Sequence, residues 1–269
     1  MPAARLASLH RYPVKGLSPE PLAEARLEAN AHFPGDRLYA VENGDSSYDP
    51  EAPRHEPKIR YFQLMRNEAL ARLSTRYDDA RGTLAVEKDG ALALEADLRS
   101  EEGRAALGAL LAEQVGPAAV RGPARALEGT RGHRFTDSRI GFVSILNRAS
   151  VAALEERVGR PVDPLRFRAN LLVEGWAPWA EFDLVGRLVG VGDEARLVVT
   201  TRTQRCAATE VDPATGLRDM NVVRTLQCAF GHADCGVYAR VVRGGRVRPG
   251  DAVRDLGPAG EGGDALPFG

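Results

Sequence analysis

A cysteine close to two arginines is the residue of this 269-residue chain best suited to chemistry. Cys206 follows Arg202 and Arg205 within residues 200–216. Positive charge near a thiol lowers its pKa, and the resulting thiolate is the form that acts as a nucleophile or metal ligand. A free cysteine is also among the most frequently buried residue types, where it packs as a small hydrophobe. Residue types and spacing alone therefore leave two alternatives open at Cys206, a reactive thiolate and a buried structural thiol.

The other two cysteines, Cys228 and Cys235, lie with His232 within residues 228–235. A zinc site normally has four ligands, and this spacing matches no common zinc finger. The pattern therefore favours a loop with buried thiols over a metal site. Three cysteines also argue against a disulfide framework and are too few for a four-thiolate iron–sulfur cluster.

The composition of the chain excludes several classes of protein. A net charge of −1 and a pI near 6.5 provide no whole-protein attraction to nucleic acid or to anionic membranes. No stretch approaches the ~20 apolar residues of a membrane span, and the N-terminus lacks the apolar run of a signal peptide. We therefore expect a cytoplasmic protein that binds neither nucleic acid nor a membrane.

Short strands and few helices are expected in the first 120 residues. Apolar stretches on both sides of Asp89-Gly90 are typical of a β-hairpin. Ser100 is a typical N-cap for a helix that ends at Gly116-Pro117, and a short helix is expected within residues 61–73. The expected strands comprise residues 6–14, 22–27, 38–41, 83–86 and 91–94.

The second half of the chain also favours strands. Ser150 is expected to cap a helix that ends at Gly159, and Asp212 to cap a turn that ends at Gly216. A hairpin is expected about Gly244-Gly245. The expected strands comprise residues 165–173, 187–191, 196–201, 237–242 and 246–253.

These patterns predict a β-rich α+β protein with two domains. Residues 116–133 are rich in Gly and Pro and read as a connector. We therefore expect a β-barrel-like domain at residues 1–120, a second β-rich domain at 121–255 and a flexible, Gly-rich tail at 256–269.

Five motifs resemble, in the same order, those of MOSC domains, named for the C-terminal domain of molybdenum-cofactor sulfurases. The signature is Arg205-Cys206 followed by Thr-Glu-Val-Asp-Pro-Ala-Thr-Gly at 209–216. The other motifs are Tyr-Pro-Val-Lys-Gly at 12–16, Gly-Asp-Arg at 35–37, Phe-Arg-Ala-Asn-Leu at 167–171, and Gly-Val-Tyr at 236–238 with Arg-Pro-Gly-Asp at 248–251. The resemblance covers about residues 1–255 and is strongest to proteins with a β-barrel domain ahead of MOSC. That group includes the mitochondrial amidoxime-reducing component and bacterial reductases of N-hydroxylated compounds.

The resemblance implies a MOSC-type β-barrel domain with a few flanking helices and a bound molybdenum cofactor, a metal held by the dithiolene of a phosphorylated pterin. Cys206 matches the metal ligand of the family, and a soft thiolate suits molybdenum. The remaining candidate positions for cofactor binding are Lys15, Arg37, Ser144, Asn147, Arg168, Asn170, Arg205 and Tyr238.

Each group of these residues matches one part of the cofactor. Lys15 and Arg37 match positions on the phosphate side, where fixed cations are needed. Arg168 and Asn170 match the pair that binds the pterin, and on the expected strand they would face the same side. Arg205 and Tyr238 match positions near the metal. Ser144 and Asn147 lie in a segment that matches the family less closely.

The implied activity is the two-electron reduction of small N-hydroxylated or N-oxide compounds. The chain offers too few cysteines to hold its own iron–sulfur cluster, so a separate flavin or iron–sulfur protein is expected to deliver electrons. Two alternatives stay open: a sulfur carrier with a persulfide on Cys206, and a non-catalytic molybdopterin-binding protein. Binding of pyridoxal phosphate is not expected.

Overall fold

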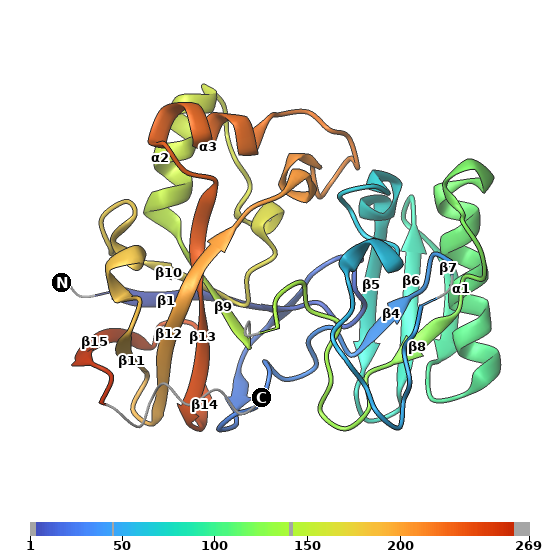
Figure 1. Ribbon diagram of the computed structural model, residues 1–269, viewed down its shortest axis with the longest axis horizontal. Coiled ribbons are helices and arrows are strands. Elements are labelled where there is room, and N and C mark those ends of the chain that lie inside the picture. The colour runs from blue at the N-terminus through green and yellow to red at the C-terminus, as the bar shows by residue number, and fades with distance from the viewer. Residues whose placement is uncertain (1–3, 45, 140–141, 261–269) are drawn as a thin grey trace.

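The computed structural model describes residues 4–44, 46–139 and 142–260, which form two parts lying side by side (Figure 1). One part is a closed barrel of seven strands, sealed by the pairing of its first and last strands, β1 and β10. The predicted β-rich class with a barrel is thereby confirmed. Around the barrel the strands are β10 (Leu171–Glu174), β9 (Val143–Asn147), β13 (Asp234–Arg243), β12 (Ala195–Gln204), β11 (Arg187–Val191), β15 (Ala252–Pro258) and β1 (Ala4–Arg11).

Branched aliphatic side chains fill the barrel. Leu6 of β1, Val173 of β10 and Val199 of β12 belong to one buried cluster, because alternate residues of each strand point inward. Two helices, α2 (Arg148–Val158) and α3 (Val222–Phe230), lie together at one end of the barrel (Figure 1). Short strands β2 (Glu20–Leu22), β3 (Ala25–Leu27) and β14 (Gly245–Val247) pair at its margin.

The second part consists of two small sheets covered by a helix. In one sheet β4 (Tyr39–Val41) pairs with β8 (Ala126–Glu128). In the other, β6 (Thr83–Lys88) lies between β5 (Leu73–Asp78) and β7 (Ala91–Asp97). Helix α1 (Glu101–Val115) packs beside β7 (Figure 1). The 3₁₀ turns are η1 (Lys58–Arg60), η2 (Glu68–Arg72), η3 (Pro117–Ala119), η4 (Pro164–Phe167), η5 (Ala180–Leu184) and η6 (Ala207–Glu210).

Local sequence signals with a specific backbone mechanism are confirmed. Asp89 and Gly90 both have positive φ, 52° and 81°, as a two-residue hairpin turn between β6 and β7 requires. The Ser100 hydroxyl accepts a hydrogen bond from the Gly103 N–H at 2.9 Å and so caps α1. Asp212 caps its turn by accepting bonds from the Ala214 and Thr215 N–H groups.

Two predicted element boundaries near the site are wrong. The strand expected at 165–173 begins only at Leu171, because Pro164 and the Asp163 cap favour the 3₁₀ turn η4. Asn147, not Ser150, caps α2 by accepting a bond from the Ala149 N–H. The Ser150 hydroxyl instead donates to the buried carboxylate of Glu181 at 2.8 Å.

Three further elements differ from those expected. No hairpin forms about Gly244, because a close approach places this residue against β3, where a Cβ would lie 2.6 Å from the Leu27 carbonyl oxygen. Helix α3 was not expected, since Val222, Val223 and Thr225 are β-branched and favour strands. The short helix expected within 61–73 is the 3₁₀ turn η2, and β5 follows it at once.

Residues 4–33 contribute to both parts, with Val14 and Leu17 in the core of the second part and more of the chain at the barrel. Leu9, Leu27 and Phe33 are all buried in the core cluster of the barrel. The domain boundary after residue 120 stays a prediction, and most of the expected tail lies outside the described residues. Among the described helices none combines the length and apolarity needed to cross a bilayer.

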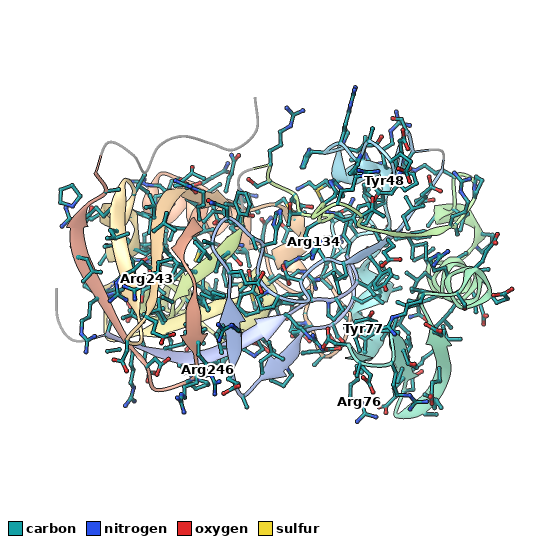
Figure 2. The ribbon with its side chains drawn as sticks, turned by 90° about the horizontal axis from the view of Figure 1, so that it is seen from below. Tyr48, Arg76, Tyr77, Arg134, Arg243 and Arg246 are labelled. Carbon is teal, nitrogen blue, oxygen red and sulfur yellow. The ribbon has the colours of Figure 1, made fainter. Side chains whose placement is uncertain are left out.

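Buried arginine contacts tie the two parts together. Arg11 of β1 binds Glu20 at 2.7 Å and donates to the Tyr77 carbonyl of β5 at 2.8 Å. Its side chain is only 10% exposed. Tyr77 is buried, whereas Arg76 lies at the surface of the same strand (Figure 2). Arg11 and Glu20 thus form a desolvated ion pair at the barrel, and the bond from Arg11 to Tyr77 joins this pair to β5. Disruption of a buried pair costs more than that of an exposed one.

A glycine marks the closest approach between the turn after Lys15 and the segment before η2. Gly16 has φ of 85°, and a Cβ there would lie 3.1 Å from the Phe62 carbonyl oxygen and 3.2 Å from Gln63 Cα. This approach brings the main chain at Lys15 beside Gln63.

We expect Gly16→Ala to destabilise the protein more than Gly90→Ala. Both residues have positive φ, which costs a non-glycine residue about 1–2 kcal/mol. Only Gly16 is crowded, since nothing lies within 4 Å of a Cβ at Gly90. Crowding should add at least ~1 kcal/mol to the loss in the free energy of unfolding. Urea denaturation measures both variants, and equal losses would show that the close approach is unimportant.

Candidate functional site

A pocket of about 410 Å³ lies between the two parts and receives residues from both. Its walls carry an excess of positive charge, with seven basic and two acidic side chains among the described residues. Cys206 and Tyr238 also line it. The basic side chains are Lys15, Arg37, Lys58, Arg166, Arg168, Arg202 and Arg205, and the acidic ones are Asp36 and Asp137.

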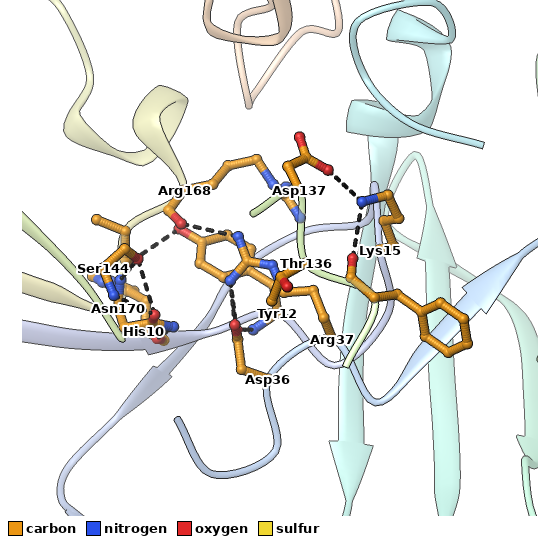
Figure 3. Close-up of polar contacts among 12 residues, drawn as sticks. His10, Tyr12, Lys15, Asp36, Arg37, Thr136, Asp137, Ser144, Arg168 and Asn170 are labelled. Atoms are coloured by element: carbon orange, nitrogen blue, oxygen red, sulfur yellow. Dashed lines mark hydrogen bonds and ion pairs between the residues drawn. The ribbon is translucent and has the colours of Figure 1, made fainter. Parts of the chain in front are cut away.

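Two arginines of the pocket wall pack against the ring of one buried tyrosine, Tyr12 (Figure 3). The guanidinium carbons of Arg37 and Arg168 lie 4.4 Å and 4.3 Å from the centre of the Tyr12 ring. Arg37 also binds the Asp36 carboxylate at 2.6 Å and donates to the Arg168 carbonyl oxygen at 3.1 Å. These contacts hold two positive charges close together.

Both arginines adopt a backbone conformation that is unfavourable for side chains with a Cβ. The φ angles are 47° at Arg37 and 53° at Arg168. A left-handed residue other than glycine is strained and often marks a functional site. Arg168 was expected on a strand, but it is the residue that ends η4, and this turn directs it into the pocket wall.

Arg168 has an incomplete set of partners. Its Nη1 donates to the Leu17 carbonyl oxygen at 2.7 Å, whereas Nη2 is buried and has no partner among the described residues. Burial, together with the positive charge of Arg37, lowers the pKa of Arg168 to about 10. An unpaired buried donor is costly, so this guanidinium is suited to an anionic ligand.

Lys15 reaches the pocket with an internal counter-ion. Its ammonium group binds Asp137 and donates to the Phe135 carbonyl oxygen at 2.9 Å (Figure 3). Burial lowers the pKa of Lys15, and the attraction of Asp137 opposes that shift. Lys58 lies 3.5 Å from the same carboxylate, so Asp137 serves two lysines.

Cys206 stands at the end of β12, where the chain turns into η6. Its side chain is half-buried, and its carbonyl oxygen accepts a bond from the Thr209 N–H at 3.0 Å. Lys58 lies beside it. Burial lowers the pKa of Lys58, but its interactions with Asp137 and with Cys206 outweigh that effect and raise it. A half-buried thiol in a cationic pocket is compatible with a metal ligand or a nucleophile.

Ser144 and Asn170 line the pocket but bind mainly each other. Asn170 Oδ1 accepts bonds from the Ser144 N–H at 3.0 Å and its hydroxyl at 2.9 Å (Figure 3). Asn170 Nδ2 donates to the His10 carbonyl oxygen at 3.2 Å. Asn147 is absent from the described lining of the pocket and binds Ala177 and Glu181 instead.

Arg205 and Tyr238 both line the pocket, and the guanidinium of Arg205 is already hydrogen-bonded within the protein. Arg205 donates to the carbonyl oxygens of Cys235 and Phe167 and stacks over the Phe167 ring. It therefore fixes the wall behind Cys206. Tyr238 pairs with Ser144 across β13 and β9, and burial raises the pKa of its hydroxyl.

Several pocket residues were not predicted from the sequence. Lys58 was noted only as one of a few lysines, and nothing marked Gln63, Asp137 or Thr203. These residues lie far from Cys206 along the chain or carry ordinary side chains, so only the fold brings them together. Arg66 is exposed and lies outside the described pocket lining.

Cys228, His232 and Cys235 do not form a metal site in the described part of the chain. Cys228 is exposed on α3, whereas Cys235 is buried, and burial raises the pKa of Cys235 to about 12. No group of three or more His, Cys, Asp or Glu side chains among the described residues could hold a metal ion. The expected loop with buried thiols is therefore wrong at Cys228, which lies exposed on α3, and agrees with the structure only at the buried Cys235.

Arg166 and Arg168 differ in pairing, and we expect their substitution by methionine to destabilise the protein to different degrees. Arg166 is 2% exposed and binds Asp212 at 2.8 Å and Asp219 at 2.8 Å. Arg166→Met should therefore lower the free energy of unfolding by about 3 kcal/mol or more. Arg168→Met should cost the ligand-free protein ~1 kcal/mol or less, because its lost bonds are offset by relief of an unpaired donor. Denaturant unfolding measures both, and equal losses would mean that Arg168 is mainly structural.

Comparison with known proteins agrees with this arrangement. The family model described as the MOSC N-terminal beta barrel domain matches residues 3–122, and that of the MOSC domain matches residues 133–254. Mitochondrial amidoxime-reducing component 1 of Mus musculus is 31% identical over 125 residues, which cover 42% of this chain and 36% of that protein. The match thus spans about a third of the length of this curated relative.

Solved structures show more distant likeness. The YUAD protein from Bacillus subtilis has a TM-score of 0.43 at 14% identity, covering 93% of this chain and 94% of its own. YiiM from Geobacillus stearothermophilus has a TM-score of 0.36 at 22% identity, and the match covers 47% of this chain and 59% of YiiM.

The two family models together span both parts that enclose the pocket. MOSC domains are associated with binding of the molybdenum cofactor, a phosphorylated and therefore anionic ligand. The unpaired Arg168 donor and the cationic lining fit such a ligand. The chain is a member of the MOSC family, with a MOSC N-terminal beta barrel domain ahead of its MOSC domain.

Proposed function

We propose that this protein is a molybdenum-cofactor-dependent reductase of N-hydroxylated and N-oxide compounds, with Cys206 as the protein ligand of the metal. The observation that carries the proposal is the buried, unpaired Nη2 of Arg168 in a cationic pocket that also contains a half-buried thiol. A ligand that satisfies both features must combine an anionic group with a thiophilic centre.

The pocket residues fit the parts of that cofactor. The volume of the pocket, about 410 Å³, falls in the usual range for small-molecule sites, roughly 300–1,000 Å³. Lys15, Arg37 and Arg168 would hold the phosphate and the polar edge of the pterin, and Cys206 Sγ would hold the metal. Ser144 and Asn170 would act indirectly, because their mutual bonds shape the segment that presents Arg168.

Reduction of an N–OH group to N–H consumes two electrons and two protons and releases one water. When bound, the cofactor supplies the two-electron chemistry, while the chain supplies ligation, orientation and charge. Arg37 and Arg168 orient an anionic ligand through their fixed positions against Tyr12. Tyr238 and Lys58 place polar hydrogen-bond donors in the wall that also contains Cys206.

The electron source belongs to the same proposal. With three cysteines the chain has fewer thiols than a four-thiolate cluster needs. We expect a separate flavin or iron–sulfur protein to deliver electrons. The protein from Mus musculus is named for the reduction of amidoximes, which supports this class of substrate for the test.

We expect Cys206→Ser to lose most of its molybdenum when purified from a host that makes the cofactor. Removal of the thiolate leaves a weaker oxygen ligand for a thiophilic metal. Plasma mass spectrometry measures molybdenum per chain, and reduction of benzamidoxime with an artificial electron donor measures activity. Cys228→Ser is the matched control, because this cysteine is exposed on α3.

The outcomes separate the three functions. One molybdenum per wild-type chain, lost with activity in Cys206→Ser and retained in Cys228→Ser, supports the reductase. Cyanide-labile sulfur without molybdenum would point to a sulfur carrier. Bound pterin without reduction of any N-hydroxylated compound would leave a binding protein. Full reductase activity in Cys206→Ser would falsify the proposed role of this thiol.

A further inference from the structure

Gln63 is a buried amide in the wall of the pocket, beside the turn that carries Lys15. It is 6% exposed and lines the pocket together with Lys15 and Gly16. A Cβ on Gly16 would lie 3.2 Å from Gln63 Cα, which shows how closely the two segments approach. Gln63 belongs to the second part of the molecule, whereas Cys206 lies at the barrel.

The main chain of Gln63 is held in a defined position. Its N–H donates to Asn67 Oδ1 at 3.3 Å, and its carbonyl oxygen accepts bonds from the N–H groups of Arg66 at 3.1 Å and Asn67 at 3.0 Å. The side chain is oriented as well, because Oε1 accepts a bond from the Met65 N–H at 3.1 Å. The amide nitrogen must therefore point away from Met65.

Nε2 of Gln63 has no hydrogen-bond partner among the described residues, although it is buried. A buried amide that cannot reach an acceptor loses the solvation it had in water. Since Nε2 offers only donors, its partner must bring an acceptor. The nearby wall supplies further donors and positive charge from Lys15 and Arg168, so an anionic oxygen is the acceptor that suits all three.

We propose that Gln63 binds the phosphate end of the ligand, donating from Nε2 to a phosphate oxygen alongside Lys15. That the phosphate belongs to a molybdenum cofactor rests on the proposed function, whereas the need for a phosphate-like acceptor does not. The proposal extends the anion site across both parts: Gln63 and Lys15 approach from one side, and Arg168 from the turn at the end of η4.

Two substitutions distinguish ligand binding from a structural role. Gln63→Glu keeps an oxygen that can accept from the Met65 N–H but replaces the donor with a negative charge. Gln63→Met removes both groups at a similar volume. Gln114→Met is the control, because Gln114 Nε2 donates to the Ala69 carbonyl oxygen outside the pocket lining.

Isothermal titration of inorganic phosphate into full-length protein from a host that cannot make the cofactor measures the anion site directly. We expect both Gln63 variants to bind phosphate about 10-fold to 100-fold more weakly than wild type, because a hydrogen bond to a charged group is lost. Gln114→Met should bind as wild type does. When the proteins are purified from a cofactor-producing host, fluorescence measures the pterin released per chain. We expect less pterin from both Gln63 variants than from wild type, and the wild-type amount from Gln114→Met.

The results discriminate clearly. Unchanged phosphate affinity in Gln63→Glu, in protein whose thermal unfolding matches wild type, would overturn the proposal, as would wild-type protein that binds no phosphate at millimolar concentration. Weakened phosphate binding without any molybdopterin in the wild-type protein would support Gln63 and count against the proposed reductase instead.

Discussion

The structure depends most on positive charge that is buried between its two parts. Arg37 and Arg168 share the ring of Tyr12, and only Arg37 has a carboxylate within its own contacts, from Asp36. Both residues are in the left-handed region, at a cost of order 1–3 kcal/mol each. Rigid neighbours must supply the compensating stability. The Tyr12 N–H binds Asp36, and the Arg37 N–H binds the Tyr12 carbonyl oxygen at 2.7 Å, so a short segment of main chain enforces the arrangement.

Neither part of the molecule can form this pocket alone, and the contacts between them explain why it keeps its shape. Arg218 donates to the Ala207 carbonyl oxygen next to Cys206 and to the carbonyl oxygens of Leu64 and Met65 next to Gln63. One side chain thus links the thiol segment to the opposite wall. Together with Arg11 of β1, which donates to the Tyr77 carbonyl oxygen of β5, it couples the position of Cys206 to the second part. A ligand that bridges the parts would stabilise this arrangement by mass action.

The sequence was informative at three places where a few neighbouring residues decide the backbone, although the Ser150 cap and the Gly244-Gly245 hairpin were predicted wrongly in the same way. The Asp89-Gly90 turn, the Ser100 cap and the turn begun by Asp212 each depend on a few neighbouring residues, and each is confirmed. Most of the candidate site residues that the motif resemblance identified line one pocket, although their roles stay predictions. Lys58 and Gln63 carried no local signal. The proximity of Lys58 to Cys206 arises from how the two parts pack, and that of Gln63 to Lys15 from packing within the second part.

Residues of one motif differ in whether their side chains are free to bind a ligand or are already hydrogen-bonded within the protein. Within the segment at 167–171, the side-chain amide of Asn170 is hydrogen-bonded to Ser144 and to the His10 carbonyl oxygen. Nη2 of Arg168, in contrast, has no partner among the described residues. Replacing a saturated group disturbs the shape of the wall, whereas replacing an unsaturated one removes an interaction that exists only with ligand. Sequence spacing treats the two residues alike. Buried donors without a partner separate them. By the same criterion Asn147 is occupied by the cap of α2 and by Glu181, whereas Gln63 Nε2 has no partner among the described residues.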